Sequence, residues 1–319
     1  MMNLSKNYFT ATIFFIVGIL LFWLSVRNIE FVRFFETIKT IKIKWLIFSV
    51  FLGYFAFILR ALRWKLMIEP SGYNVRFSKL LHSVVFGYLF NLIIPRSGEI
   101  VRCSTLSRSN NIPISPLVGH VILERLIDVL VLCLCLILVL ILNFDQFISF
   151  SNLFKIPWTL IISLASFAII LILIFKKIFF LNEAFTKKIT SFYKGLKDGF
   201  MSFNLLKNKI IFIFYTLLIW LCYFFMTYLC FFCFEELKTL SLQDGLFVMV
   251  AGGLGMIVPT PSGMGSYHFL VIKSMSVISI GNEISTYYAL TVHTSQTLML
   301  IIGGLISMYF LYVSNESKL

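Results

Sequence analysis

An all-α membrane protein with several spans is the fold class that the sequence predicts, on three observations. Hydrophobic residues make up 59% of the 319 positions, phenylalanine occurs 36 times, and 13% of the residues are charged. A soluble core cannot bury so much apolar surface. The apolar residues also gather in runs close to the ~20 residues that cross a hydrocarbon layer of about 30 Å. We expect about six full transmembrane helices and two re-entrant hairpins in one integral membrane domain over residues 1–319.

Six apolar runs define the expected full spans. They cover residues 8–27, 44–62, 116–143, 157–181, 207–234 and 284–313. The first run has no small-residue cleavage site, and Trp23 to Arg27 resembles an interfacial anchor, so we expect a retained helix. No hydrophilic stretch is long enough for a soluble catalytic domain. Any activity must therefore reside in the membrane part.

The placement of lysine and arginine predicts the sidedness of the loops, because cytoplasmic loops are enriched in both. Residues 176–209 contain eight lysines and two acidic residues, so we expect them in the cytoplasm. The loops 27–44 and 60–79 contain five basic residues each and leave the N-terminal half undecided. If residues 78–115 form a re-entrant hairpin, the N-terminus is cytoplasmic and the first of these loops lies outside. If residues 78–95 cross fully, the reverse holds.

Two proline breaks in the apolar sequence favour the hairpins. NLIIPRSGEIVR at 91–102 and GMIVPTPSGMGSYHF at 255–269 both run from apolar residues through proline and Ser-Gly into a new helical pattern. This repetition divides the chain into halves 1–156 and 157–319, each with the order helix, helix, hairpin, helix, and with one half inverted. Inverted repeats with Pro/Gly-interrupted segments are typical of transporters whose substrate site lies at the repeat interface. The alternative is a chance match between two turns.

Each break is expected to form an anion site. The residues expected to break the backbone are Asn91, Pro95, Pro259 and Pro261. Irregular backbone at membrane depth needs protein or water as its hydrogen-bond partner, and the half-helix that follows presents N–H groups with a partial positive charge. Gly98, Gly263 and Gly265 would let a ligand approach the backbone closely. The alternative is a simple turn at the membrane interface.

Charged residues inside the apolar segments are expected to be paired or functional, because an arginine at mid-membrane costs about 2.5–3.5 kcal/mol. Candidate ligands for a lipid headgroup or anion are Arg60, Arg63, Arg96 and Arg102, and candidate gating or charge partners are Glu99, Glu124, Arg125, Asp128 and His293. Glu99 and Arg102 lie three residues apart on one helical face, where they can pair. Snorkelling to ordinary headgroups and a purely interfacial ion cluster are the alternatives.

The sequence predicts neither a metal nor a cofactor nor a catalytic residue. His82, His120 and His268 have no ligand-like spacing, and the six cysteines lie mostly in apolar runs, where we expect them to pack. The expected partners are membrane lipids, with a lipid-modifying enzyme or a glycosyltransferase as a further candidate. No nucleic acid is expected.

Four motifs resemble those of one membrane family. They are R-x-x-R-W at 60–64, N-x-x-x-P-R-S-G-E-x-x-R at 91–102, E-R-x-x-D at 124–128 and P-x-P-S-G-x-G at 259–265. In order and approximate spacing they resemble the lysylphosphatidylglycerol synthase transmembrane-region family, whose members are also called flippase-like domain proteins. The motifs span residues 60–265 of the 319, from the second expected transmembrane helix to the second expected hairpin.

The resemblance implies a role in moving or presenting an anionic or modified lipid across the cytoplasmic membrane. Two departures from the family pattern limit what is implied. Many members carry an arginine in the last helix, where this chain has His293. The aminoacyl-transfer domain of the fused enzymes has no counterpart in this sequence, so synthesis of a lysyl-lipid is not implied.

The leading hypothesis is a multi-pass, flippase-like protein of the cytoplasmic membrane with both chain ends in the cytoplasm. In this hypothesis the half-helix N-termini, with Arg96 and Arg102, hold a lipid phosphate. Two alternatives stay open. An integral-membrane enzyme acting on a polyprenyl or phospholipid substrate would need paired carboxylates, for which Glu124 and Asp128 are the available pair. A non-transporting partner of a glycosyltransferase would use the embedded charges for structure alone.

Overall fold

The computed structural model describes residues 4–27, 29–154, 197 and 201–316. The helices, in chain order, are α1 (Leu4–Val26), α2 (Phe31–Thr40), α3 (Ile43–Ile68), α4 (Phe77–Ile93), α5 (Gly98–Asn110), α6 (Ile114–Leu142), α7 (Phe144–Phe154), α10 (Lys209–Phe231), α11 (Leu242–Ile257), α12 (Ser266–Val277) and α13 (Asn282–Glu316). Short 3₁₀ turns at Glu69–Ser71 (η1), Glu235–Leu237 (η2) and Pro261–Gly263 (η3) connect some of them. The described residues contain no strand, which confirms the all-α class.

Four of these helices are long and apolar enough to cross a membrane: α3, α6, α10 and α13. Each coincides with a span that hydropathy predicts, and α1 begins and ends within a few residues of the first predicted span. The predicted span at 157–181 and most of the lysine-rich loop at 176–209 lie outside the described residues. The structure is therefore that of an all-α polytopic membrane protein, and the count of about six spans stays a prediction.

The first hairpin consists of α4 and α5, which pack against each other and are separated by a break at residues 94–97. α4 ends because Pro95 disfavours helical backbone at the residue before it, and Ile94 is extended with φ −124° and ψ 116°. Arg96 then takes a left-handed conformation with φ 63°, which reverses the chain.

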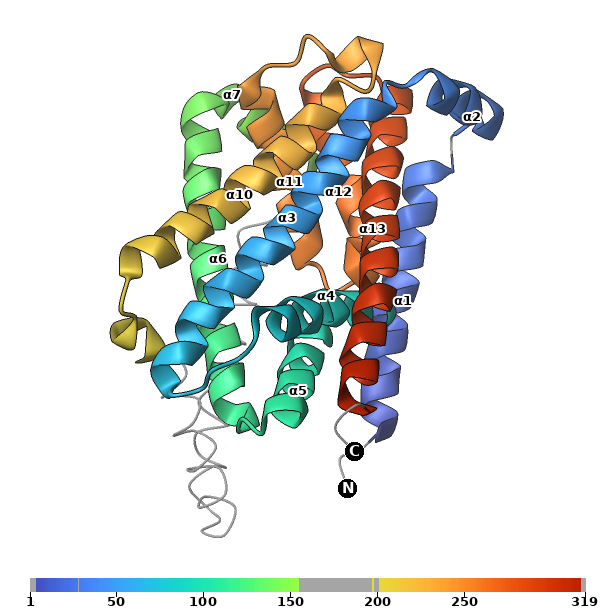
Figure 1. Cartoon of the computed structure of the whole chain (residues 1–319). Helices are drawn as coiled ribbons and strands as arrows, with labels where there is room; N and C mark the ends of the chain where they lie inside the picture. Colours follow the sequence, from blue (N-terminus) through green and yellow to red (C-terminus); the bar gives the residue numbers. More distant parts are fainter. Residues whose placement is uncertain (1–3, 28, 155–196, 198–200, 317–319) are drawn as a thin grey trace.

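The second hairpin consists of α11 and α12, which also pack against each other. Val258, just before Pro259, is again extended. The chain then passes through left-handed backbone at Ser262, Gly263 and Gly265 before α12 begins. Figure 1 shows α4 and α5 toward the end of the molecule that holds both termini, and α11 and α12 reaching in from the opposite end. Entry of either hairpin into the bilayer and inversion of the two halves stay predictions.

Two segments that the sequence suggests as loops contain helices. α2 lies within the 27–44 loop, and α7 fills most of the 144–156 loop. Both helices are far shorter than a membrane-crossing helix. Hydropathy over a span-length window does not register them, although their apolar residues recur at helical spacing.

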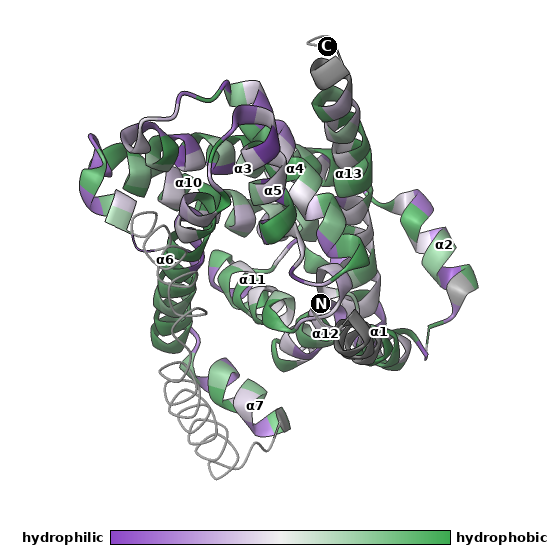
Figure 2. Ribbon diagram, turned by 90° about the horizontal axis from the view of Figure 1, so that it is seen from below, coloured by the Kyte–Doolittle hydropathy of each residue, from purple (hydrophilic) through white to green (hydrophobic). Residues whose placement is uncertain are grey.

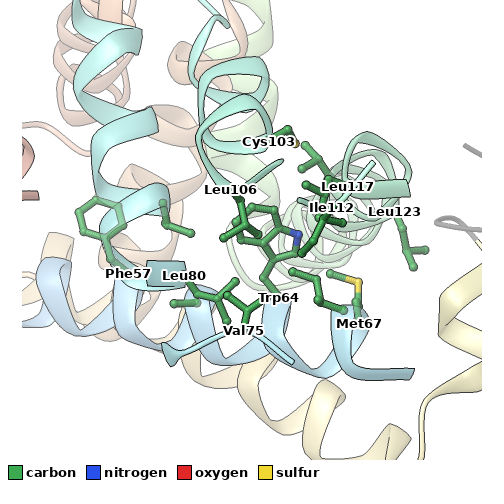
Figure 3. Packing of buried hydrophobic residues seen from close by; sticks show 14 of the residues in the cluster. Phe57, Trp64, Met67, Val75, Leu80, Cys103, Leu106, Ile112, Leu117 and Leu123 are labelled. Atoms are coloured by element: carbon green, nitrogen blue, oxygen red, sulfur yellow. The ribbon is translucent and has the colours of Figure 1, made fainter. Parts of the chain in front are cut away.

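A buried cluster holds α3, α4, α5 and α6 together and positions the charged residues described below. Trp64 of α3 is fully buried among Leu80 of α4, Leu106 of α5 and Leu117 of α6 (Figure 3). Within lipid such contacts stabilise helix association by close packing rather than by removing apolar surface from water. This packing fixes the four helices relative to one another around the site.

The outer surface of α6 is apolar and exposed. Figure 2 shows hydrophobic residues along the length of this helix, and only 6% of its most apolar stretch is buried. Leu130, Leu134 and Ile141 are each more than 60% exposed. An apolar patch of this size on a soluble protein would be a site of association. Here it is the surface expected of a helix that contacts lipid.

Candidate functional site

A buried ion cluster lies where α3, α5 and α6 meet. Arg60 and Arg63 lie on one face of α3, and Glu124 and Asp128 lie on one face of α6, because residues three or four apart share a helical face. Arg60 contacts Asp128 at 3.1 Å, and Arg63 contacts the second oxygen of the same carboxylate at 3.0 Å. Arg63 also lies 3.7 Å from Glu124. Asp128 therefore joins both arginines of α3 to α6.

α5 completes the cluster through Arg102. This arginine pairs with Glu124, and its guanidinium lies 4.8 Å from the centre of the Trp64 ring, in cation–π contact. Arg102 is one turn into the helix that follows the first break, so the break sets its position. The geometry of the hairpin therefore controls the charge pairing, because moving the break would move Arg102 away from Glu124.

α10 supplies two neutral hydrogen-bond partners for the arginines of α3, and neither was predicted from the sequence. The hydroxyl of Tyr223 accepts a hydrogen bond from Arg60 Nε at 2.7 Å, and Thr216 accepts one from Arg63 Nη1 at 3.2 Å. Thr216 and Tyr223 are seven residues apart, close to two helical turns, and so lie on one face. Two polar side chains on one face of an apolar helix are the sequence signal that could have identified these two residues.

The buried ion cluster has more positive than negative groups. Its members are Arg60, Arg63, Arg102 and Arg125, with Glu124 and Asp128 as their partners. Four guanidinium groups facing two carboxylates leave a formal excess of two positive charges. Burying an ion without full compensation costs several kcal/mol. The cluster is therefore suited to accepting a further negative group.

Several guanidinium nitrogens in the cluster have no hydrogen-bond partner among the described residues. These are Nε and Nη1 of Arg102, Nε and Nη2 of Arg63, and Nε of Arg125. The side chain of Arg102 is only 4% exposed. Each unsatisfied buried donor costs about 1–3 kcal/mol. A ligand with anionic oxygens would satisfy donors that the protein itself leaves free.

Glu99 lies at the edge of the cluster rather than in it. The expected pairing of Glu99 with Arg102 is replaced by the pairing of Arg102 with Glu124 on the neighbouring helix. Glu99 Oε2 is buried and has no hydrogen-bond partner among the residues that the structure describes. Arg125 faces the same region and pairs with Asp128 at 3.2 Å, with its side chain one-third exposed.

A groove on the outer face of α5 and α6 reaches this edge. The α5–α6 groove has a volume of about 320 Å³ and opens to the surface. Its lining residues are Glu99, Ile100 and Cys103 of α5 with Val118, Val121, Ile122, Arg125, Leu126 and Val129 of α6. An inner cleft of about 10 Å³ adjoins it and is lined by Val84, Gly87, Tyr88, Asn91, Gly98, Glu99, Arg102 and Arg125. Glu99 and Arg125 line both spaces.

The first break uses its amide and glycine residues to hold α5 against α4. Asn91 Oδ1 accepts a hydrogen bond from the Gly98 N–H at 2.7 Å and so caps the start of α5. A side chain at Gly98 would collide with the carbonyl oxygen of Gly87, which explains the need for glycine. The group that approaches the Gly98 backbone closely in this structure is therefore α4, where the sequence suggested a ligand.

Arg96 lies outside the buried ion cluster. Its Nη2 donates to the carbonyl oxygens of Met256 and Ile257, at 3.2 and 2.6 Å, in the last turn of α11. A positive group at a helix C-terminus satisfies carbonyls that have no helical partner and matches the helix dipole. Arg96 therefore connects the first break to the second. A role for it in headgroup binding stays a prediction.

The second break lies beside α13. His293 Nε2 lies 3.0 Å from the Ser262 carbonyl oxygen, and its ring centre is 4.6 Å from that of His268. Gly263 and Gly265 both have positive φ. A side chain at Gly265 would meet the backbone of Gly18 in α1, so this glycine permits a close helix contact. The anion-binding role of these glycines and the gating role of His293 stay predictions.

Six of the predicted charged residues thus form one cluster: Arg60, Arg63, Arg102, Glu124, Arg125 and Asp128. Arg96 and His293 lie at the breaks instead. Among the described residues, no group of three or more His, Cys, Asp or Glu side chains is placed to hold a metal ion.

Comparison with known proteins supports the family resemblance that the four motifs indicate. A family model described as the lysylphosphatidylglycerol synthase TM region matches residues 11–304. A UPF0104 membrane protein of Methanocaldococcus jannaschii is 21% identical to the chain, over 97% of each protein. No solved structure matches the chain.

Proposed function

Because the chain belongs to the lysylphosphatidylglycerol synthase transmembrane-region family, we propose that it moves or presents an anionic or modified lipid, such as a glycolipid, across the cytoplasmic membrane. The observation that carries the proposal is the buried ion cluster, with its two excess positive charges and its unpartnered guanidinium nitrogens. Arginine binds phosphate through two parallel hydrogen bonds. The cluster is therefore matched to the phosphate of a lipid headgroup.

The roles of the cluster residues follow from their pairing. Arg102 has two free nitrogens and lies at the inner cleft, so it is the best-placed phosphate ligand. Asp128 holds Arg60 and Arg63 in position, and Glu124 holds Arg102. A phosphate that binds Arg102 competes with Glu124 for the same guanidinium. Exchange of partners at Arg102 would couple headgroup binding to movement of α5 relative to α6.

Transport is proposed in preference to catalysis because the two carboxylates already have arginine partners. Glu124 and Asp128 each contact at least two guanidinium groups. A general base or acid needs a carboxyl group that is free to exchange a proton with the substrate. Both carboxylates are held by guanidinium groups in this arrangement. A structural partnership with a glycosyltransferase would not require the unpartnered nitrogens of Arg102.

The proposed topology places both chain ends in the cytoplasm. Figure 1 shows both termini at one end of the molecule, together with the α3–α4 connection and the end of α5. Lys65, Arg76 and Arg108 belong to these segments. Positive charge is concentrated on the cytoplasmic side of membrane proteins. Labelling of a cysteine at Lys39 in α2 from the outside of intact cells would support this topology, and labelling only after permeabilisation would contradict it.

The transport proposal is tested by reconstitution. Purified full-length protein in liposomes that contain fluorescent phosphatidylglycerol, a fluorescent glycolipid or fluorescent phosphatidylcholine is exposed to dithionite, which quenches only the outer leaflet. We expect quenching beyond the outer-leaflet fraction for the anionic or glycosylated lipid. No acceleration for any of the three lipids, with the protein shown to be folded, would contradict the proposal.

Arg102→Gln provides the variant for this assay. It removes one positive charge and the two free nitrogens, while Glu124 keeps its contact with Arg63. We expect the flipping rate to fall at least about tenfold, which corresponds to the loss of one charge-assisted hydrogen bond of about 1.4 kcal/mol or more. Arg108→Gln, in the last turn of α5 and outside the cluster, is the control and should keep the wild-type rate.

A further inference from the structure

We propose that the α5–α6 groove binds one phospholipid taken sideways from the bilayer, with an acyl chain on its apolar walls. At the inner end of the groove, Arg125 binds the phosphate, and Glu99 binds a hydroxyl or ammonium group next to that phosphate. The inference rests on the proposed function and adds a binding site, an entry route and a headgroup chemistry to it. Three observations support the inference: the form of the groove, the unpartnered polar atoms of Glu99 and Arg125 at its inner end, and Arg102 behind them.

The walls of the groove fit an acyl chain. Ile100 of α5 and Ile122, Leu126 and Val129 of α6 line it, and each of these side chains is between 42% and 64% exposed. Its volume of about 320 Å³ lies within the range of roughly 300–1,000 Å³ that is typical of small-molecule sites. Ile122, Leu126 and Val129 are on the apolar face of α6, which has the smallest buried share of the four described spans. The molecules that surround such a face in the membrane are lipids.

Glu99 and Arg125 lie at the inner end of the groove, behind a wall whose exposed surface is apolar. Glu99 Oε2 and Arg125 Nε are buried atoms without a hydrogen-bond partner in the described part of the chain. Both residues line the groove and the inner cleft. The two groups carry opposite charge, one accepting and one donating hydrogen bonds. A headgroup that satisfies both must present an anionic oxygen to Arg125 and a donor to Glu99.

A phosphodiester with a neighbouring hydroxyl or ammonium group has this combination. A phosphocholine group has the phosphate but no N–H or O–H donor, so it would leave Glu99 unsatisfied. An unsatisfied buried carboxylate costs more than a neutral group, which alone costs about 1–3 kcal/mol. The site should therefore distinguish headgroups by the donor next to the phosphate, in addition to their charge.

The inner cleft sets where the headgroup stops. Its volume of about 10 Å³ holds no more than a single water molecule. Arg102 lies behind it, 4% exposed and with two free nitrogens. In the proposed complex the side chains of Arg125 and Glu99 turn toward the groove to meet the headgroup, and Arg102 stays behind the cleft. The groove is thus the entry site, and Arg102 is the next ligand once α4 and α5 separate.

The experiment measures lipid association with the reconstituted full-length protein. Spin-labelled phosphatidylglycerol, phosphatidylethanolamine and phosphatidylcholine with identical acyl chains are compared by the fraction of label that the protein immobilises. We expect one selective site per protein at which a donor-bearing lipid is favoured about tenfold over phosphatidylcholine, as for one hydrogen bond to a charged group. Selection of phosphatidylglycerol identifies a hydroxyl headgroup, and selection of phosphatidylethanolamine an ammonium headgroup. No preference over phosphatidylcholine would overturn the inference.

Groove-filling variants locate the site. Ile122→Trp places a large ring in the groove, whereas Ile137→Trp makes the same change on α6 outside it, at a similarly exposed position (42% and 52%). We expect the first variant to abolish the selective site and the second to keep it. Val129→Trp, also in the groove, replaces Ile122→Trp if that variant does not fold. Equal selectivity in the groove and control variants would overturn the inference.

The headgroup contact is tested with Glu99→Gln. This change keeps an acceptor oxygen but removes the charge, so an ammonium group should lose about tenfold in relative association and a hydroxyl group less. Unchanged selectivity for either lipid would remove Glu99 from the site. A selective site without flipping would leave the groove standing and contradict transport. Flipping at the wild-type rate in Ile122→Trp would contradict the groove as the entry site and leave the transport proposal standing.

Discussion

Arg96 donates a 2.6 Å hydrogen bond to the carbonyl oxygen of Ile257, and this contact joins the two chain breaks of the protein. The two residues are 161 positions apart, one in the turn of the first hairpin and the other in the last turn of α11. Arg96 makes the contact from a left-handed backbone with φ 63°, which is costly for a residue other than glycine. The fold therefore maintains a strained residue to hold the hairpins together.

The strain at Arg96 predicts an order among its variants. Arg96→Ala loses both hydrogen bonds to α11 and keeps the left-handed backbone, whereas Arg96→Gly loses the same bonds but relieves the strain. We expect the alanine variant to be less stable than the glycine variant by about 1 kcal/mol. Thermal unfolding of both variants in the same detergent measures the difference. An alanine variant as stable as the glycine variant would show that the backbone is not strained there.

Asp128 is the most connected acid of the buried ion cluster, and Asp128→Asn should be the most damaging neutral substitution. It removes the shared partner of Arg60, Arg63 and Arg125. Breaking a buried pair from one side costs about 3–5 kcal/mol. Asp145→Asn, at an exposed position of α7, is the control and should change the free energy of unfolding by less than about 0.5 kcal/mol. A loss below about 1 kcal/mol for Asp128→Asn would mean that solvent or lipid already compensates the arginines.

Gly98→Ala tests the close contact of the first hairpin. A methyl group at this position would meet the Gly87 carbonyl oxygen, which is backbone and cannot rotate away. We expect α4 and α5 to separate slightly, at a cost of about 1–3 kcal/mol. Gly281→Ala, where nothing lies within 4 Å of the added carbon, is the matched control. The measurement is again thermal unfolding; equal stability of the two variants would contradict the close contact.

The sequence predicts correctly those features that depend on one local segment, namely the positions of the long helices and of the chain breaks. Hydropathy alone places α3, α6, α10 and α13, because each must be apolar over its own length. Pro95 and Pro259 predict where the hairpins break, because proline acts on its immediate neighbour. α2 and α7 were missed because neither is long enough to register as a span.

Pairing between distant segments was less predictable. Glu99 and Arg102 are neighbours on one helix, yet Arg102 pairs with Glu124, which lies 22 positions along the chain. Arg60 and Asp128 each appeared as candidates, but nothing in the sequence joins them. Helical spacing indicates which residues share a face, whereas the packing of α3, α5 and α6 decides which faces meet. The residue types of the site were therefore predictable and their partners were not.

A pH dependence is expected at the loop between α10 and α11, outside the spans. Lys238 and Lys42 both contact Glu235 and lower the pKa of its carboxyl group. Because the pKa is lowered, the charged carboxylate stabilises the folded state at pH values above the ordinary carboxyl pKa of about 4.5. This contribution is lost as the pH falls through the lowered pKa. The contribution is small because Glu235 is fully exposed.

The measurement compares Glu235→Gln with the wild type. The melting temperatures should differ by a small constant amount between pH 6 and 8, and the difference should shrink toward zero in acid. High salt should reduce it at neutral pH, since exposed ion pairs are screened. A difference that grows on acidification would reverse the sign of the expected linkage.

Tyr223→Phe tests whether α10 belongs to the functional site. The phenol of Tyr223 accepts from Arg60 Nε at 2.7 Å, and the substitution leaves this buried donor without a partner. We expect a loss of about 1–3 kcal/mol in the free energy of unfolding. Because Asp128 is then the one remaining hydrogen-bond partner of Arg60 among the described residues, the position of Arg60 in the cluster should also loosen and the flipping rate should fall. Tyr215→Phe, on the same helix and without a hydrogen bond to the cluster, is the matched control. Full stability together with a reduced flipping rate would assign Tyr223 to transport alone, whereas an unchanged rate with reduced stability would make α10 a structural wall of the cluster.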